Sequence, residues 1–508
     1  MKKSFKMIFN RTALVALAII LQVAIIFASL QYFYEYYIAV QTVSAIFGAL
    51  VLIAIINQKT MPEFKLSWML VVLIFPLLGT MLYLMFSKNT VARRLRKHMT
   101  PFASEYLRSC QVSREGYTET EREFNQKGLP KYIVSSASLS AFGGTNTRFF
   151  PFGEEMYRSL IEDLKKAEKF IFMEYFIVEP GEMWSSIVDI LEQKVKEGLD
   201  VRVLYDDLGS SPHVKSSYYK TLRKSGIKCY KFNKFIPVVS GIHNNRDHRK
   251  ITVIDGQIGY TGGLNMADEY CNFTHPYGKW KDTAVRLSGK AVNNLTLLFL
   301  ENYNMTAGTK DHFSDYLLAQ AEETEENAMV QPFGDGPEPQ YHELIAENAF
   351  LSMIENAKES VYITTPYLII DYTLQRALCF AAKRGVDVQL ITPGVPDKKL
   401  VYAVTRSNYG VLLKAGVKIY EYTPGFIHSK TVVADGKVAF CGTVNFDYRS
   451  LVHHFECGVL LYGGKTVTEM QNDFIATSRE CREVPKNYRQ NPLVGWVCDL
   501  LTILTPLL

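Results

Sequence analysis

A short motif occurs twice in the chain, and this repetition constrains the fold more than any other feature of the sequence. The motif is a His, a Lys two residues later and an Asp five residues after the Lys. The copies occupy residues 248–255 and 428–435, and in both an Asn follows the motif Asp by ten residues, at Asn265 and Asn445. One such match can arise by chance, but a second match with the same downstream Asn indicates an internal repeat.

The sequence around each motif predicts an α/β lobe. In both halves a short β-branched or aromatic run is followed by an amphipathic stretch and a second apolar run, which is typical of a parallel sheet covered by helices. The expected elements are strands over 169–175, 201–205, 360–365 and 388–391, and helices over 183–197 and 374–383. We therefore expect an α/β fold of two duplicated lobes.

Composition suggests where these lobes begin and end. An acidic, helix-prone stretch around Glu322–Asn327 is expected to join them. The expected segments are a membrane region over 1–97, a polar connector over 98–130, the first lobe over 131–310, the second lobe over 329–490 and an apolar tail over 491–508. The tail is expected either to pack on the second lobe or to lie on a lipid surface.

The first hundred residues have the pattern of a membrane region. Three apolar stretches, 13–34, 36–56 and 66–86, are each long enough to cross a bilayer core of about 30 Å as a helix. Pro76 and Gly79 interrupt the third stretch, and a cleaved signal peptide is the alternative interpretation of the first.

The distribution of charge suggests an orientation for this region. Residues 1–100 hold eleven Lys and Arg against two Asp and Glu, with a basic cluster over 88–97 directly after the third stretch. The positive-inside rule therefore predicts a multi-pass membrane protein with cytoplasmic lobes. The same rule also places the N-terminus inside, which three spans do not allow, so the number and orientation of the spans stay open.

The remaining composition argues against other classes of protein. The net charge of +5 comes from the N-terminal region, and the rest of the chain holds 45 basic against 49 acidic residues. A nucleic-acid partner is therefore not expected. The eight cysteines are scattered without a C-x-x-C pair, so we expect neither a disulfide framework nor a metal site.

The motif residues suit chemistry on a phosphodiester. In a strand, a His and a Lys two residues apart point to the same face. A neutral imidazole can attack phosphorus or transfer a proton near pH 7, an ammonium stabilises the phosphate charge, and an Asn donates to its oxygens. A site that joins both copies would hold two imidazoles, as a two-step displacement requires.

The paired motif resembles that of the phospholipase D superfamily, and within it the chain most resembles the bacterial cardiolipin synthases. Further similar stretches are residues 68–86, 245–246, 278–282, 423–428 and 445–450. The resemblance implies two phospholipase D-like lobes, with mixed sheets flanked by helices, that form one active site in a bacterial cell-membrane protein. It also implies transfer of a phosphatidyl group from one phosphatidylglycerol to another, giving cardiolipin and glycerol through a phosphohistidine, without a metal or other cofactor.

The resemblance also implies roles for individual residues. His248 is expected to be the nucleophile and His428 the general acid and then base, although the symmetry of the motifs allows the reverse. The other residues of the implied site are Lys250, Lys430, Asn265 and Asn445 around the phosphate, and Asp282 and Glu456 as carboxylates that orient the imidazoles. Asp255 and Asp435 complete the catalytic motifs but are expected to be structural, because each precedes a Gly at a bend.

One position departs from the family pattern. Related sequences commonly have Asn before the Phe-Glu pair, whereas this chain has His454 before Phe455 and Glu456. The substitution is either tolerated or changes the preference for an acceptor.

Two alternatives remain at the level of the sequence. One is a membrane-bound phospholipase D, or another phosphatidyltransferase, in which water or a different alcohol is the acceptor. The other is an inactive lipid-binding or scaffolding protein, which degenerate motifs would mark, but here both motifs are intact. Neither the oligomeric state nor the acyl-chain preference follows from the sequence.

Overall fold

A computed structural model describes residues 37–58, 60–87, 128–235, 244–318 and 328–504, together with a few single positions. The chain divides into two compact units. The small unit contains residues 1–90, 235–244 and 503–508, and the large unit contains residues 91–234 and 245–502. Both motifs belong to the large unit.

The described part of the small unit contains the helices α3 (Tyr37–Asn57), α4 (Pro62–Ile74) and α5 (Pro76–Phe86). Helix α3 coincides with the second apolar stretch of the sequence. The third apolar stretch is not one continuous helix, and that expectation is wrong: the chain turns at Phe75 between α4 and α5. Proline has no backbone N–H and its ring clashes with the preceding turn, so Pro76 ends α4 and begins α5.

Helices α4 and α5 pack against each other. The rings of Trp68 and Tyr83 lie 5.5 Å apart in an edge-to-face contact. A side chain at Gly79 would collide with the carbonyl of Val71, so the close approach of the two helices requires glycine at this position. A helical hairpin therefore replaces the expected single span.

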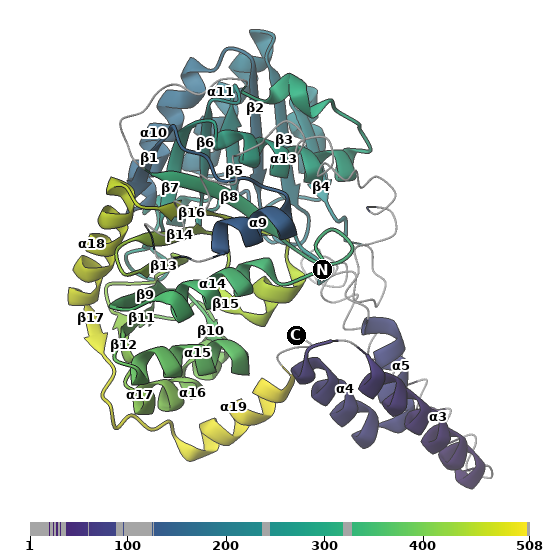
Figure 1. Cartoon of the computed structure of the whole chain (residues 1–508). Coiled ribbons are helices and arrows are strands. Elements are labelled where there is room, and N and C mark those ends of the chain that lie inside the picture. Colours follow the sequence, from purple (N-terminus) through teal and green to yellow (C-terminus); the bar gives the residue numbers. More distant parts are fainter. Residues whose placement is uncertain are drawn as a thin grey trace. The chain divides into compact units, whose positions relative to one another are not determined.

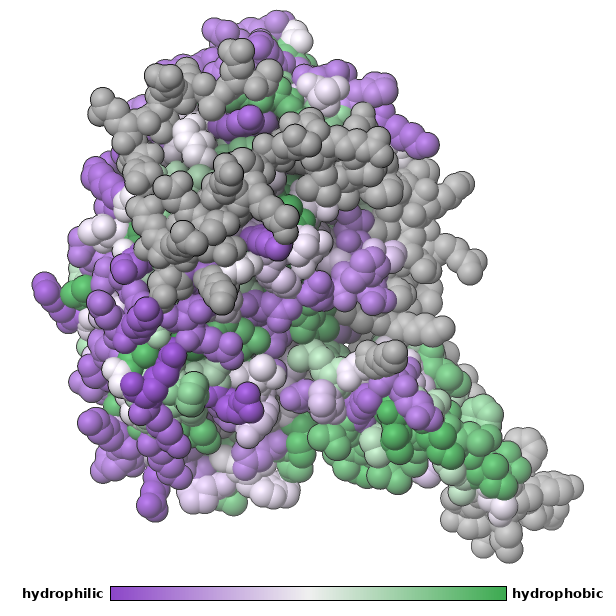
Figure 2. Space-filling view, in the orientation of Figure 1, coloured by the Kyte–Doolittle hydropathy of each residue, from purple (hydrophilic) through white to green (hydrophobic). Residues whose placement is uncertain are grey.

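Many large apolar side chains of the small unit are exposed. On α3 they include Val43, Phe47 and Leu50, which are each more than half exposed, and Figure 2 shows apolar residues over much of the visible surface of α3, α4 and α5. Within the described residues, none of the helices combines the length and the apolar character that crossing a membrane requires. The first predicted span and the basic cluster over 88–97 lie almost entirely outside the described residues.

The large unit contains two mixed β-sheets with helices packed around them (Figure 1). In order across the first sheet, the strands are β1 (Thr145–Phe150), β7 (Ala284–Gly289), β6 (Ile258–Gly262), β5 (Ile251–Ile254), β2 (Phe170–Tyr175), β3 (Asp200–Asp206) and β4 (Lys228–Phe232). In order across the second, they are β17 (Cys481–Glu483), β12 (Lys418–Tyr422), β11 (Asp387–Pro393), β9 (Ser360–Thr364), β13 (Thr431–Ala434), β14 (Val438–Gly442), β16 (Glu456–Tyr462) and β8 (Met329–Asp335).

The two sheets repeat the same topology, which confirms the predicted duplication. Strands β2, β3 and β4 are parallel, as are their counterparts β9, β11 and β12, and the motif strands β5 and β13 join them antiparallel. The strands and helices expected from sequence periodicity are present within one to two residues of their predicted bounds. The second sheet differs by its additional edge strand β17.

Helices cover the sheets and also link the two lobes. Helix α13 is buried along most of its length, because it packs on strands of the first sheet and on β8 of the second, and α18 packs on the second sheet and on β1 of the first. Within its described residues, the large unit has the helices α9 (Leu129–Ala137), α10 (Gly153–Lys166), α11 (Glu182–Lys196), α12 (Tyr218–Lys224), α13 (Val292–Ala307), α14 (Ile345–Asn356), α15 (Tyr372–Lys383), α16 (Lys399–Ser407), α17 (Tyr409–Ala415) and α18 (Lys465–Arg479), and α19 (Pro492–Leu504) follows them.

Shorter elements complete the fold. They are the paired strands β10 (Leu368–Ile369) and β15 (Phe446–Asp447), the 3-10 turns Asp268–Cys271 and Phe313–Tyr316, and a π-helical turn at Arg449–His453. Helix α19 lies within the predicted apolar tail, and Leu493 and Trp496 are largely exposed on it. The predicted linker at Glu322–Asn327 lies outside the described residues.

Candidate active site

The motif histidines lie where the two lobes meet. His248 lies three residues before the start of β5. Its backbone N–H donates to the carbonyl of Phe455 in the second lobe at 2.9 Å. In the same way, the backbone N–H of His428 donates to the carbonyl of Lys281 in the first lobe at 2.8 Å. Each histidine is therefore held at its backbone by the opposite lobe, which brings both imidazoles into one buried site.

The orienting carboxylates are exchanged between the lobes. His248 Nδ1 lies 2.9 and 3.0 Å from the two carboxylate oxygens of Glu456, and His428 Nδ1 lies 2.6 Å from Oδ2 of Asp282. A carboxylate at Nδ1 places the proton of a neutral imidazole on that nitrogen, so Nε2 keeps its lone pair. Each lobe thus prepares the imidazole of the other lobe for attack or proton transfer.

Burial keeps both imidazoles neutral. The pKa of His248 is lowered well below its usual value by burial, with the positive charge of Lys250 as the next cause. The pKa of His428 is lowered to about 4 by burial and by Lys430, although Asp282 opposes the shift. At neutral pH both groups have an available lone pair, as nucleophilic attack requires.

The two motif lysines lie beside the imidazoles. Lys250 Nζ donates to the carbonyl oxygen of His248 at 2.6 Å, and Lys430 makes the same bond to His428. Both side chains are buried, and burial lowers the pKa of Lys250 to about 8 and that of Lys430 to about 7. An anionic phosphate would favour the charged ammonium form of both lysines.

The motif asparagines are also buried, but their surroundings differ. Asn265 accepts a bond from the backbone N–H of Ile177 at 3.1 Å and donates to the hydroxyl of Tyr270 at 2.7 Å. The Oδ1 atom of Asn445 is buried without a hydrogen-bond partner. Asn265 is therefore already engaged at both ends of its amide, whereas Asn445 has a free polar atom.

The motif aspartates bind backbone N–H groups away from the imidazoles. Asp255 accepts backbone N–H groups of residues 168–170 at 2.8 Å each, and Asp435 accepts those of residues 358–360 at 2.8–3.1 Å. They follow the far ends of β5 and β13 and adopt φ values of 54° and 53°. Their contacts fit the expected structural role at the bend, because they tie each motif strand to the start of its neighbour.

The two carboxylates differ in their other partners. Glu456 also accepts hydroxyl bonds from Thr443 and, at 2.7 Å, from Ser450. Asp282 accepts the backbone N–H of Thr283 at 2.8 Å. Gly263 occupies the place of Thr443 in the first lobe, and a side chain there would collide with Asp282.

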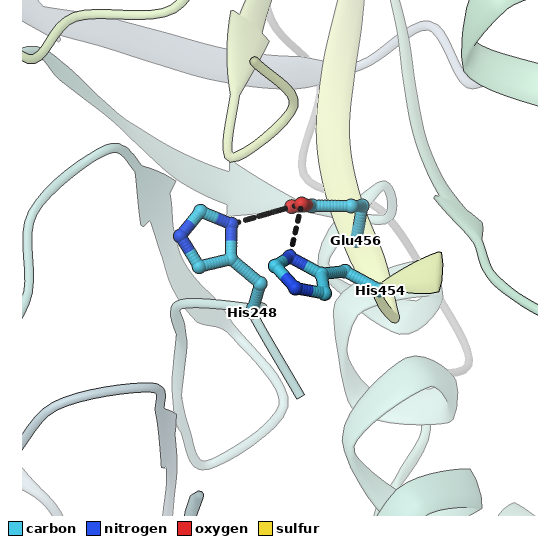
Figure 3. Close-up of side chains that lie close together, drawn as sticks. All are labelled: His248, His454 and Glu456. Carbon is cyan, nitrogen blue, oxygen red and sulfur yellow. Dashed lines mark hydrogen bonds and ion pairs between the residues drawn. The ribbon is translucent and has the colours of Figure 1, made fainter. Parts of the chain in front are cut away.

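A third imidazole, His454, lies beside this site, and sequence reasoning did not place it there. His454 Nδ1 is 3.5 Å from Oε1 of Glu456, and its ring centre is 5.3 Å from that of His248 (Figure 3). Its counterpart in the first lobe is Trp280, which also stands two residues before the carboxylate and lies 5.7 Å from the ring of His428. Aligning the two carboxylates would have revealed this correspondence.

The structure brings together a group of possible metal ligands that the sequence did not indicate. The ligand atoms of His248, His454 and Glu456 lie within 4.8 Å of one another, and all three side chains are buried. Spacing along the chain could not indicate this group, because His248 comes from one lobe and the other two residues from the other.

Two buried arginines, one on each side of His248, form ion pairs in the first lobe. Arg246 donates to the carboxylate of Asp206 at 2.8–3.0 Å, and Arg249 pairs with Glu301 at 3.0 Å. In the second lobe, the position of Arg249 is taken by Ser429. These ion pairs are specific to the first lobe and fix the backbone on both sides of His248.

Known proteins resemble this chain over most of its length. A family model described as "Cardiolipin synthase, PLD-like domain" matches residues 160–276 and 350–477. A cardiolipin synthase of Halalkalibacterium halodurans is 35% identical over 83% of this chain and 84% of its own length. The chain belongs to the cardiolipin synthase family. A second family model, described as "Phospholipase_D-nuclease N-terminal", matches residues 45–88.

Other comparisons extend this family assignment. An uncharacterised protein of Streptococcus mutans is 42% identical over 86% of this chain and 95% of its own length. Among solved structures, a phosphatidylserine synthase of Haemophilus influenzae superposes with a TM-score of 0.58 at 14% identity, covering 76% of this chain and all of that one. At such low identity the likeness shows the fold alone, which is the duplicated fold expected of a cardiolipin synthase relative.

Proposed function

We propose that this protein is a cardiolipin synthase, which transfers the phosphatidyl group of one phosphatidylglycerol to a hydroxyl of another and releases glycerol. The observation that carries the proposal is the pair of buried imidazoles, each oriented at Nδ1 by a carboxylate of the opposite lobe. A single imidazole would suffice for proton transfer, but two are what a displacement through a covalent intermediate needs. The similarity to cardiolipin synthases names the substrate class.

In the first step, Nε2 of His248 attacks phosphorus and the bond from phosphorus to the glycerol oxygen breaks. His428 must then give a proton to the departing alkoxide. His428 is neutral in the ligand-free site, so it must take up this proton when the anionic phosphate binds. The phosphate charge and Asp282, 2.6 Å from its Nδ1, both favour the imidazolium. The products of this step are phosphatidyl-His248 and glycerol.

In the second step, His428 removes the proton from a hydroxyl of a second phosphatidylglycerol. The oxygen attacks phosphorus, the bond to His248 Nε2 breaks, and cardiolipin leaves. One phosphodiester replaces another, so the exchange needs no nucleotide.

The assignment of His248 as nucleophile rests on the difference between the two imidazoles. His248 has lysine and histidine neighbours that all lower its pKa, whereas Asp282 raises the pKa of His428 against the effect of burial. The more basic group is the better proton carrier, and the group that stays neutral is the better nucleophile. Lys250 and Lys430 would compensate the negative charge of the phosphate.

We further propose that the protein takes both lipids from a membrane to which the small unit attaches it. The exposed apolar side chains of α3 to α5 support this, because a broad apolar surface is unfavourable in water. The basic cluster over 88–97 supports a cytoplasmic position of the lobes in a bacterial membrane. Attachment at the bilayer would present the acceptor lipid to the intermediate and limit its hydrolysis.

The proposal is tested by incubating the purified full-length protein with phosphatidylglycerol vesicles and following lipids and free glycerol by mass spectrometry. Cardiolipin and glycerol in equal amounts are the expected products. Phosphatidic acid as the dominant product would instead identify a phospholipase D that uses water, and a new phosphodiester from an added alcohol would identify another phosphatidyltransferase.

A further inference from the structure

His454 gives the second lobe a polar ring where the first lobe has Trp280. The side chain of His454 is more than nine-tenths buried, and its Nδ1 has no hydrogen-bond partner. Figure 3 shows this nitrogen and Nδ1 of His248 both facing the carboxylate of Glu456. An indole at this position, such as that of Trp280, could only pack beside the active imidazole, whereas an imidazole can also coordinate a cation.

The three groups have the spacing of a metal site. Ligands 2.0–2.1 Å from a tetrahedral zinc ion are about 3.4 Å from one another. Glu456 Oε1 lies 2.9 Å from His248 Nδ1 and 3.5 Å from His454 Nδ1, and all three ligand atoms lie within 4.8 Å. Two imidazoles and one carboxylate form a ligand set that zinc accepts, with a fourth position left open.

We propose that His248, His454 and Glu456 bind a divalent transition metal, of which zinc is the representative, and that the bound ion blocks the transfer reaction. The claim of a block rests on the proposed function, while the claim of a site does not. The ion would take Nδ1 of His248, which now donates its proton to Glu456.

Coordination at Nδ1 and nucleophilic attack at Nε2 exclude each other. A neutral imidazole has one nitrogen with a lone pair and one with a proton. When Nδ1 of His248 binds the ion, the proton moves to Nε2, so the number of protons is unchanged but the attacking lone pair is lost. The ion therefore inhibits through the tautomer of the nucleophile, without covering it.

One neighbouring group, the guanidinium of Arg449, opposes binding of the ion and offers a way to change its affinity. Arg449 Nε donates to His454 Nε2 at 3.3 Å, which places the proton of His454 on the nitrogen that would coordinate. Binding must give up this bond. Removing the arginine side chain is therefore expected to tighten binding, which would not follow if His454 only filled space.

The experiment is calorimetric titration of ZnCl2 into the full-length protein in detergent micelles, without lipid. We expect one tight site in the wild-type protein and in His453→Asn, which removes the adjacent imidazole that is not part of the cluster. His454→Asn should weaken binding at least about 10–100-fold, the loss seen even for outer partners of a metal site, and Arg449→Met should strengthen it. His454→Trp, which copies the residue of the first lobe, serves as a second ligand-deficient variant if the Asn variant does not fold.

The inhibition is measured separately, by adding ZnCl2 to the assay with phosphatidylglycerol vesicles. Turnover should fall with an inhibition constant equal to the calorimetric Kd and return when EDTA is added. The same affinity in wild-type, His454→Asn and His454→Trp proteins would overturn the site, as would the absence of binding in the wild-type protein. Tight binding through His454 in a protein that makes no cardiolipin would overturn the proposed function and leave the site intact.

Discussion

The two lobes present the same imidazole, ammonium and amide to the site, but they support the imidazoles differently. His248 is oriented by Glu456, which also accepts bonds from two hydroxyl groups, whereas His428 is oriented by Asp282, which also accepts one backbone N–H. A duplicated backbone can therefore hold two similar groups in unlike environments. Unlike environments are what two different roles, nucleophile and proton carrier, require.

The largest expected effect comes from removing either imidazole. His248→Ala and His428→Ala should each lower kcat by about 10⁴-fold or more, because one removes the atom that bonds to phosphorus and the other the proton donor. Only His428→Ala should accumulate a phosphatidyl-enzyme, detected by mass spectrometry of the intact protein. His342→Ala, which removes an exposed imidazole, is the control. Accumulation in His248→Ala would exchange the two roles.

Replacing each orienting carboxylate by its amide should lower kcat by different amounts in the two lobes. In Asp282→Asn, the amide oxygen must face the N–H of Thr283, so the amide NH₂ faces His428 Nδ1 and imposes the wrong tautomer, with an expected loss in kcat of about 10⁴-fold. In Glu456→Gln, the NH₂ can donate to Thr443, whose hydroxyl is able to turn to the carbonyl of Cys457 at 3.0 Å.

The amide oxygen of Glu456→Gln would then still accept from His248, so we expect a loss of only about 10–100-fold, as for other orienting partners. Steady-state kinetics with phosphatidylglycerol vesicles measure both variants, and circular dichroism checks their folding. Equal losses in the two variants would show that the hydroxyl partners of Glu456 do not matter.

The lysines predict an asymmetric pH profile. Burial favours the neutral amine, so the ammonium that binds phosphate is lost as pH rises through about 7 for Lys430 and about 8 for Lys250. The value of kcat/KM should therefore fall about tenfold per pH unit between these two values and more steeply above both. Lys430→Arg, which stays charged, should move the decline toward the pKa of Lys250. A decline that does not move would assign it to another group.

The motif aspartates should have the smallest effect on chemistry and the same effect in both lobes. Asp255→Asn and Asp435→Asn each keep one accepting oxygen but lose the charge that holds three backbone N–H groups. We expect about 1–2 kcal/mol lower stability per substitution and a fall in apparent Tm of a few degrees. The kcat per folded molecule should change less than about tenfold. Abolished turnover in a folded variant would restore them to the catalytic set.

Much of the large unit could be predicted from its sequence, because strands and amphipathic helices follow local periodicity. The duplicated motif also identified the residues that meet in the site. It did not reveal that Asp282 orients the imidazole of the other lobe. The repeated sequence is the same whether each carboxylate binds the histidine of its own lobe or that of the other. Nor did it place His454 beside His248, because these two residues come together only when the lobes pack against each other.

The small unit was harder to predict for a different reason. Hydropathy over residues 66–86 suggests one helix, and the sequence shows that Pro76 interrupts it. A membrane helix can tolerate such a proline, so only the backbone geometry at Phe75 shows that the chain turns there. The contact between Trp68 and Tyr83 that closes the hairpin joins positions fifteen residues apart (83 − 68). Such a contact leaves no periodic signal along the sequence.

The exchange of carboxylates has a consequence for how such a chain could arise. A protein with one lobe would need a second copy of itself before its imidazole met a carboxylate, and every substitution would then change both halves of the site together. Joining the two copies in one chain removes this coupling. The two halves could then change independently, although each still depends on the other for every turnover. Their differences include Thr443 in place of Gly263 and His454 in place of Trp280.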